Sequence, residues 1–549
     1  MKRRLISLTI AVLLVSLNSC DKNFLDRSSA NSISGSDIWN SDANATMAVN
    51  GIYNSFAEGA WHTLFSYLVN VGPLGYTQIR TNWGISQYAG TATPQDGIYQ
   101  STWTGFYRII KYANDVIANV PDNANITPDV GKQLVGQAEF FRGLAYFYLW
   151  SLYGGVPIID KPLAVEESYL PRNTADEVMQ LIVNDFTNAI ADLPVAYASS
   201  SDLGRATQGA AIAMLGKTYL YAGQWSKAAE QLGKLLTSPF DYQLAEKFTD
   251  NFFAATQSNL EQVFYVQYTG IAGYGSMMDN QYGYRNHGPN YGEDYSTASN
   301  ISVQMYTNKD GSAISTSGIP QLDDFNNEDD YGVALMNWYQ ANYKDADPRL
   351  QASVILPGAD FNAAGGVQRL YWPTGTPTMD PPGIRTTWPN LATLPIRKLV
   401  TEGDACPVNS NCATNFPLIR FAGVLLMYAE AKNEESGPSP DVYNAVNRVR
   451  ARAGIADLPS GLNQDEMRNN IRLEEFREQA FETEPYFDVL RWKTASTNDP
   501  IFGLNHTIYD FRYISVLGQK VFRADRDYLW PIPQGAIDIN KNLTQNPNW

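Results

Sequence analysis

Residues 215–232 read LGKTYLYAGQWSKAAEQL, and their spacing is the clearest structural signal in the chain. The offsets are those of a tetratricopeptide unit, with leucine at the last position where phenylalanine is usual, and they are carried by Leu215, Gly216, Tyr219, Gly223, Ala228 and Leu232. Phe186, Ala189 and Pro194 repeat the second-helix spacing one unit earlier. Two successive matches predict an array of helical hairpins, with small residues packed between neighbouring helices.

Further helices are predicted on both sides of this unit, because apolar residues recur there at three- and four-residue steps. They cover 37–59, 103–120 and 133–153 before the unit, and 418–433, 442–453 and 464–481 after it, with an inserted loop at 154–173. We therefore expect an all-α fold, an α-α superhelix of tetratricopeptide-like helical hairpins.

Two segments interrupt the helical pattern. Residues 61–100 form an aromatic segment punctuated by glycine, whose later part, from Gly72, is predicted to be an ordered surface loop. Between 241 and 415 Gly, Asn, Pro and Tyr dominate, and a compact protein does not hold a structureless loop of that length. We expect an inserted, loop-rich ligand-binding region over 241–415 with short strands such as 262–268. The tetratricopeptide-like region then covers 37–240, and C-terminal helices and a tail cover 416–549.

The N-terminal residues predict export. A basic cluster at 2–4 and an apolar run over 5–17, too short to cross a membrane, indicate a signal peptide over 1–19. A small residue, Ser19, precedes Cys20, which predicts cleavage and lipidation at that cysteine with acyl chains such as palmitate. Residues 20–36 then form a tether at a membrane surface. An ordinary signal peptide followed by a chance cysteine is the alternative.

The composition restricts the class of partner. The net charge is −16 and becomes more negative once the basic signal is removed, which disfavours nucleic acid and anionic lipid. Aromatic residues make up 12% of the chain and charged residues only 17%. Aromatic rings offer an apolar face and, in Tyr and Trp, a polar tip, so this composition suits neutral polar ligands where the rings are not simply part of the core.

The two remaining cysteines, Cys406 and Cys412, lie close together in a loop-like run. In an exported chain such a pair predicts a disulfide. A metal site is the alternative, but none of the three histidines lies nearby in the sequence. We predict no metal and no cofactor.

The catalytic motifs of zinc proteases, α/β-hydrolases and phosphate-binding loops are missing from the sequence. Glu474, Glu478 and Glu482 share one helix face, and paired carboxylates can act as the acid and base of a glycosidase. Arginines interleave with them, however, so we interpret this face as solvated and held by ion pairs. The sequence therefore indicates a protein that is not an enzyme.

Several phrases, in order along nearly the whole chain, resemble the SusD/RagB family of outer-membrane nutrient-binding lipoproteins. They are CDKNFLD at 20–26, NGIYN at 50–54, FFR at 140–142, YGGVP at 153–157, DPRL at 347–350, LLMYAEA at 425–431, FD at 487–488, RW at 491–492, PIP at 531–533 and QNP at 545–547. Near 474–485 the chain departs from the family pattern of Glu-Arg followed by Glu-Gly-x-Arg, which puts an ion-pair arrangement of the family type in doubt.

The resemblance implies a glycan-binding lipoprotein that performs no chemistry. It also implies an outer-membrane location facing the cell exterior, where the protein serves polysaccharide utilisation and nutrient uptake. The implied partner is a SusC-type TonB-dependent outer-membrane transporter, over which the lipoprotein sits as a lid.

Aromatic and arginine side chains in the two irregular segments are the predicted glycan contacts, because sugar C–H groups stack on aromatic faces and arginine donates to hydroxyls. They are Tyr76, Arg80, Trp83, Tyr88, Tyr284, Tyr291 and Trp338. The rival hypothesis is a glycan-cleaving hydrolase or lyase on a helical scaffold, with Glu293 or Asp294 beside Tyr291 and Tyr295. A third hypothesis is an adhesin or assembly factor without a small ligand.

Overall fold

The computed structural model describes residues 37–57, 62–77, 84–284, 292–293, 295–363, 365–371, 393–403, 406, 411–512 and 515–549. The predicted signal peptide, Cys20 and the tether to residue 36 lie outside these ranges. Within them, the structure contains no helix that is both long enough and apolar enough to cross a membrane.

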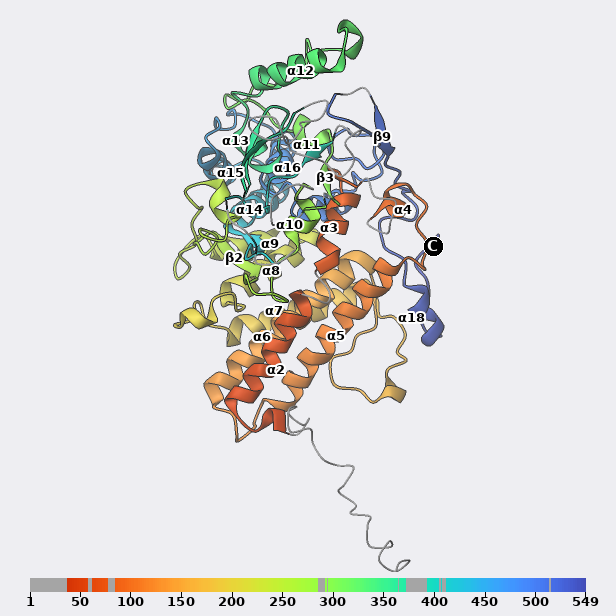
Figure 1. The fold of residues 1–549 in the computed structure, drawn as a ribbon. Helices are drawn as coiled ribbons and strands as arrows, with labels where there is room; N and C mark the ends of the chain where they lie inside the picture. The colour runs from red at the N-terminus through yellow and green to blue at the C-terminus, as the bar shows by residue number, and fades with distance from the viewer. Residues whose placement is uncertain are drawn as a thin grey trace, which may run out of the picture.

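A helical array forms one end of the molecule (Figure 1). Its helices are α2 (Asp42–Asn54), α5 (Gly97–Asn119), α6 (Pro128–Tyr153), α7 (Ala175–Asp192), α8 (Gln208–Tyr221) and α9 (Trp225–Lys234). From α5 to α9 each helix packs on the next, and α14 (Phe421–Ser436) packs on α9 although the whole inserted region lies between them in sequence. The helices α15 (Pro440–Ala453) and α16 (Gln464–Glu478) pack on α14 and extend the helical part.

Local sequence explains where these helices begin. The Thr174 hydroxyl accepts a hydrogen bond from the Glu177 N–H, and the Glu177 carboxylate accepts from the Thr174 N–H, so the two residues form a capping box at α7. Thr207 caps α8 by accepting from the N–H of Ala210.

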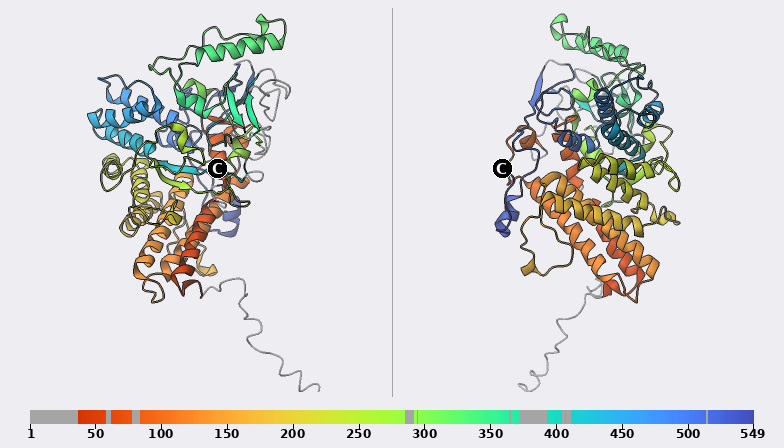
Figure 2. Two further views of the ribbon diagram at one scale, coloured as in Figure 1. Left: turned by 60° about the vertical axis from the view of Figure 1, so that its left-hand side comes forward. Right: turned by 180° about the vertical axis from the view of Figure 1, so that it is seen from behind.

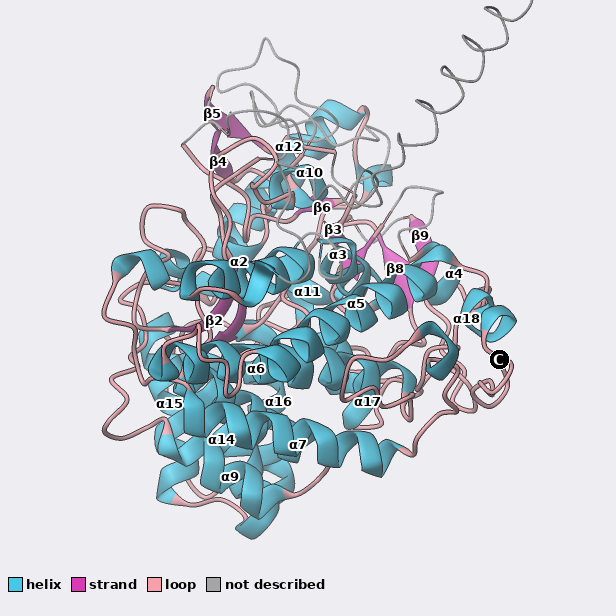
Figure 3. Cartoon of the chain, turned by 90° about the horizontal axis from the view of Figure 1, so that it is seen from below, coloured by secondary structure: helices cyan, strands magenta, loops and turns pink. Residues whose placement is uncertain are grey.

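Small residues let the helices approach closely. A Cβ atom on Gly216 of α8 would lie 2.6 Å from Cγ of Leu232 on α9, so only glycine fits this contact. The expected all-α fold of tetratricopeptide-like hairpins is confirmed, and Figure 3 shows that the strands are short pieces scattered among the helices.

The first aromatic segment is less irregular than the sequence predicts. Residues 62–71 form α3 (His62–Val71), α4 (Ile85–Tyr88) is a single turn, and α5 already begins at Gly97. The C-terminal tail likewise contains α17 (Glu484–Arg491) and α18 (Gln534–Ile539). The contacts that stabilise these helices come from distant parts of the chain, because α3 packs on α17 and α18 packs on α5.

Short antiparallel strand pairs join distant segments. β1 (Gly75–Tyr76) pairs with β3 (Thr297–Ala298), which pairs with β6 (Leu394–Pro395). β2 (Gln262–Val266) lies within the predicted strand 262–268 and pairs with β7 (Phe416–Arg420). Among the described residues there are also two hairpins, formed by β4 (Asp360–Ala363) with β5 (Gly366–Arg369) and by β8 (Thr507–Tyr509) with β9 (Val516–Gln519).

The described part of the inserted region also contains four α-helices, of which α12 is the longest. They are α10 (Met278–Tyr282), α11 (Ile301–Gln304), α12 (Glu328–Asn342) and α13 (Pro348–Ser353). Figures 1 and 2 show α12 projecting at the end of the molecule opposite α2, α5 and α6.

The acidic face of α16 is buried, and the prediction of a solvated face is wrong. Glu474 and Glu478 are 0% exposed and Glu482 is 5% exposed. Their partners come from the inserted region and from β7: the guanidinium of Arg349 lies 2.7 Å from Glu474 and 3.0 Å from Glu478, and that of Arg420 lies 2.7 Å from Glu478 and from Glu482. The chain therefore has a buried ion-pair network here despite its departure from the family pattern.

Candidate functional site

Tyr76 and Tyr88, two of the predicted contacts, lie together but pack inward. Their ring centroids are 5.9 Å apart, and with Ile508 of β8 they form a small apolar cluster separate from the main core. The Tyr76 hydroxyl donates to the Leu517 carbonyl at 2.7 Å, and the Tyr88 hydroxyl donates to the Thr77 carbonyl at 3.2 Å. Burial raises the pKa of both phenols. These two tyrosines fix their segment against the β8–β9 hairpin.

A buried lysine holds the turn that leads to Tyr76. The Nζ atom of Lys520 donates to the carbonyls of Asn70 at 3.0 Å, of Gly75 at 2.8 Å, and of Gly72. Burial lowers the pKa of Lys520 to about 7. The turn between α3 and β1 is therefore positioned by a residue from the far end of the chain.

The other predicted contacts stand on separate elements. Tyr284 is fully buried, with its ring edge against Phe361 at a centroid distance of 5.3 Å. Trp338 on α12 is half-buried, and its indole N–H donates to the Ser317 carbonyl at 3.1 Å. Among the predicted contacts that the structure describes, Tyr76 and Tyr88 thus form a pair. Tyr284 and Trp338 each pack against other residues of the inserted region.

Three predicted contacts, Arg80, Trp83 and Tyr291, lie outside the described residues, as does Asp294 of the rival hydrolase hypothesis. The other carboxylate of that hypothesis, Glu293, is described, and its backbone N–H donates to the Asn280 carbonyl at 3.0 Å.

A cavity of about 980 Å³ opens between the last turns of α2, the turn at 201–205, and β2 with the loop that follows it. Its floor and rim carry Tyr53, Tyr265, Tyr268 and Tyr274. None of these residues belongs to the set of contacts predicted from the sequence. The signal that could have found the last three is the run of tyrosines in and directly after the predicted strand 262–268, in a chain with 33 tyrosines overall.

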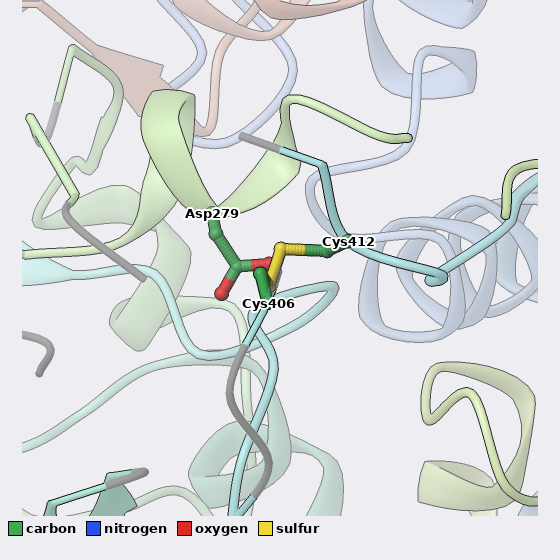
Figure 4. Close-up of side chains that lie close together, drawn as sticks. All are labelled: Asp279, Cys406 and Cys412. Carbon is green, nitrogen blue, oxygen red and sulfur yellow. A yellow bond between two sulfur atoms is a disulfide. The ribbon is translucent and has the colours of Figure 1, made fainter. Parts of the chain in front are cut away.

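The predicted disulfide between Cys406 and Cys412 is present, and it lies beside Asp279 (Figure 4). Sulfur atoms bonded to each other offer no thiolate to a metal ion. The Asp279 carboxylate accepts from the backbone N–H of Thr401 at 2.9 Å and from its hydroxyl at 2.8 Å. The disulfide and Asp279 therefore hold neighbouring segments together and do not form a metal site.

The disulfide also anchors the rim of the cavity. Ser276 and Cys412 exchange backbone hydrogen bonds of 2.8 and 3.3 Å, and the N–H of Gly273 donates to the Asn411 side chain at 2.8 Å. Gly275 lies directly against the backbone of Asn411, where a Cβ atom would clash. The loop after β2 is consequently held by the segment that the disulfide closes.

Comparison with known proteins gives consistent matches over nearly the whole chain. A family model described as "SusD family" matches residues 260–549, and one described as "Starch-binding associating with outer membrane" matches residues 23–220. SusD-like protein P2 of Formosa agariphila is 27% identical over 562 residues, covering 98% of each chain.

Solved structures share the fold. A SusD-like protein of Bacteroides fragilis has a TM-score of 0.76 at 22% identity and covers 93% of this chain and 98% of its own. Surface glycan-binding protein A of Bacteroides thetaiotaomicron, solved in complex with laminarihexaose, has a TM-score of 0.66 at 19% identity over 92% of this chain and 99% of its own.

Proposed function

Because the chain belongs to the SusD family, we propose that it is a cell-surface lipoprotein that binds oligosaccharide or polysaccharide and delivers it to a TonB-dependent outer-membrane transporter. The two family models, which match in order along the chain, carry this proposal. One of their descriptions names starch binding and association with the outer membrane, and neither names a reaction. The protein is accordingly a binding protein and not an enzyme.

The composition and the N-terminal sequence support the same function. An aromatic-rich chain with few charges suits neutral sugars. A lipid on Cys20 would hold the protein at the membrane, and the polar residues up to 36 would let it move over its transporter. We retain the sequence-based assignment of the glycan contacts to the segments around Trp83 and Trp338.

The test uses residues 21–549 and a panel of neutral polysaccharides and hexasaccharides, with affinity measured by calorimetry. Each stacked ring contributes about 0.5–1.5 kcal/mol, so Trp83→Ala combined with Trp338→Ala is expected to weaken binding about tenfold. Tyr169→Ala is the matched control, because Tyr169 is 44% exposed on the loop that follows α6. Unchanged affinity in the double variant would remove these two residues from the site.

The same incubations separate binding from cleavage. We expect no new reducing ends from any polysaccharide in the panel. Their release by the purified protein, at a rate that Glu293→Gln lowers, would favour the hydrolase hypothesis instead.

A further inference from the structure

The cavity beside α2 has the dimensions of a ligand site. Small-molecule sites typically enclose about 300–1,000 Å³, and this cavity of about 980 Å³ is at the upper end of that range. Its walls come from five separate parts of the chain, which are α2, Phe141 of α6, the turn at 201–205, β2 with its loop, and Asn411. A space of this size accommodates several linked sugar rings.

The walls are almost free of charge. Among the described lining residues only Arg205 carries a formal charge, and its guanidinium is already paired with Asp202 at 2.7 Å. Besides the tyrosine hydroxyls, the remaining polar side chains are amides and hydroxyls, which both donate and accept hydrogen bonds. They belong to Asn50, Asn54, Ser201, Gln267 and Thr269, and to Asn411, whose side-chain oxygen already accepts from the Gly273 N–H. An ionic ligand would find no free counter-charge here, whereas a neutral polyhydroxylated ligand finds many partners.

Aromatic rings stand at two depths of the cavity. Tyr274 is 63% exposed at the rim, and Tyr265 and Tyr53 are half-buried further in. A sugar ring presents C–H groups on one face and hydroxyls around its edge, so it combines stacking on such rings with hydrogen bonds to the amides.

The floor is fixed before any ligand arrives. The Tyr53 hydroxyl donates to Gln137 at 2.9 Å and accepts from the Ala206 N–H at 2.8 Å, and its ring packs edge-on against Phe141 at 4.4 Å. The rim loop is anchored through Asn411 to the disulfide segment. A rigid site loses little entropy on binding, which favours affinity.

The cavity is separate from the aromatic segment around Tyr76. Figures 1 and 3 show β2 on the opposite side of the body from α4 and β9. The residues that line the cavity include none of the contacts predicted from the sequence.

We propose that the cavity between α2 and the loop after β2 is a second saccharide-binding site, which takes a neutral hexose oligosaccharide of several units. This inference rests on the proposed glycan-binding function. Two sites on one chain would let it hold a long glycan at two points, which raises the avidity for polysaccharide above that for a short oligosaccharide.

The experiment titrates maltohexaose and laminarihexaose into residues 21–549 and into three variants. The cavity variant combines Tyr274→Ala with Gln267→Ala, both at exposed side chains, and its melting temperature is checked against the wild type. The second variant combines Trp83→Ala with Trp338→Ala, and Tyr169→Ala is the control. We expect the cavity variant to bind about tenfold more weakly at one class of site, equivalent to about 1.4 kcal/mol, and the Trp variant to keep that class.

The outcomes distinguish this inference from the proposed function. If a hexasaccharide binds the wild type and the cavity variant equally, the second site is refuted while glycan binding stands. If the cavity variant loses all binding and the Trp variant none, the cavity is the sole site and the sequence-based assignment fails. If neither hexasaccharide nor any polysaccharide of the panel binds the wild type, the proposed function fails and this inference fails with it.

Discussion

The helical array and the inserted region stabilise their interiors in different ways. In the array, helices adjacent in sequence pack through small and apolar residues such as Gly216 and Leu232, and the buried ion pair of Arg142 and Asp185 also joins two neighbouring helices, α6 and α7. In the inserted region, the interior includes fully buried charges whose partners are distant in sequence, and Arg349 and Glu478 are 129 positions apart. The spacing of apolar residues along the sequence indicates contacts within and between neighbouring helices. It gives no information about a buried ion pair whose members are this far apart in the sequence.

The largest effect is expected from breaking the buried network at Arg349. This side chain is 0% exposed and lies within 3.0 Å of Asp347, Glu474 and Glu478. Arg349→Met removes the guanidinium paired with Asp347 and one of the cations around Glu474 and Glu478. Removing one partner of a buried pair costs about 3–5 kcal/mol. Thermal unfolding monitored by circular dichroism should show a greatly lowered melting temperature, or the variant should fail to accumulate as folded protein.

Arg468→Met is the matched control, because Arg468 pairs with Glu434 at a partly exposed position on α16. Its effect should stay within about 1 kcal/mol, as for other surface pairs. Equal losses in the two variants would mean that the network contributes no more than an ordinary surface pair.

A smaller effect is expected from overfilling a contact in the array. At Gly216 a side chain would collide with Leu232, so Gly216→Val should destabilise the protein by about 1–3 kcal/mol. A Cβ atom added at Gly51 in α2 would meet no atom within 4 Å, so Gly51→Ala should instead stabilise the protein by about 0.5–1 kcal/mol. Denaturant unfolding measures both changes, and a Gly216→Val variant as stable as the wild type would contradict close packing at Gly216.

The same contrast explains what could be predicted from the sequence. The helix predicted over 133–153 is the larger part of α6, and the helix predicted over 464–481 is α16 with a shorter C-terminal end. The sequence does not predict the long helix α12. Its buried Tyr331, Leu335 and Tyr339 recur every fourth position, but exposed or half-buried apolar residues between them, such as Val333, obscure that period.

The site was harder to predict for a related reason. Tyr76 and Tyr88 stand in an aromatic segment, but their packing depends on Ile508 and Leu517, which are more than 400 positions away. The cavity combines five segments that meet only in the folded chain. The composition indicates that aromatic side chains are abundant, but it does not indicate which of their ring faces remain exposed to a ligand.

The smallest effect is expected in how stability depends on pH, which differs between the buried network and the array. Glu478 lies in the network, where burial alone would raise its pKa but the guanidinium groups of Arg452, Arg420 and Arg349 hold the pKa well below the usual range. In the array, burial dominates at Glu139 on α6 and raises its pKa to about 7, although Asn188 donates to its carboxylate at 3.0 Å. The contributions of Glu478 and Glu139 to stability therefore change with pH in opposite directions.

The sign for Glu139 follows from its raised pKa. Between about pH 4.5 and 7 the folded protein holds this proton more tightly than the unfolded chain, so the contribution of Glu139 to stability falls as the pH rises through that window. Above pH 7 the carboxylate is charged in both states, and its burial opposes folding.

Glu139→Gln keeps an acceptor for Asn188 and removes this charge, so its melting temperature should exceed that of the wild type by about 2 °C at pH 8 and match it at pH 4.5. The exposed Glu166→Gln should change neither value. A lower melting temperature for Glu139→Gln at pH 8 would mean that the array, like the network around Arg349, stabilises a buried carboxylate in its charged form.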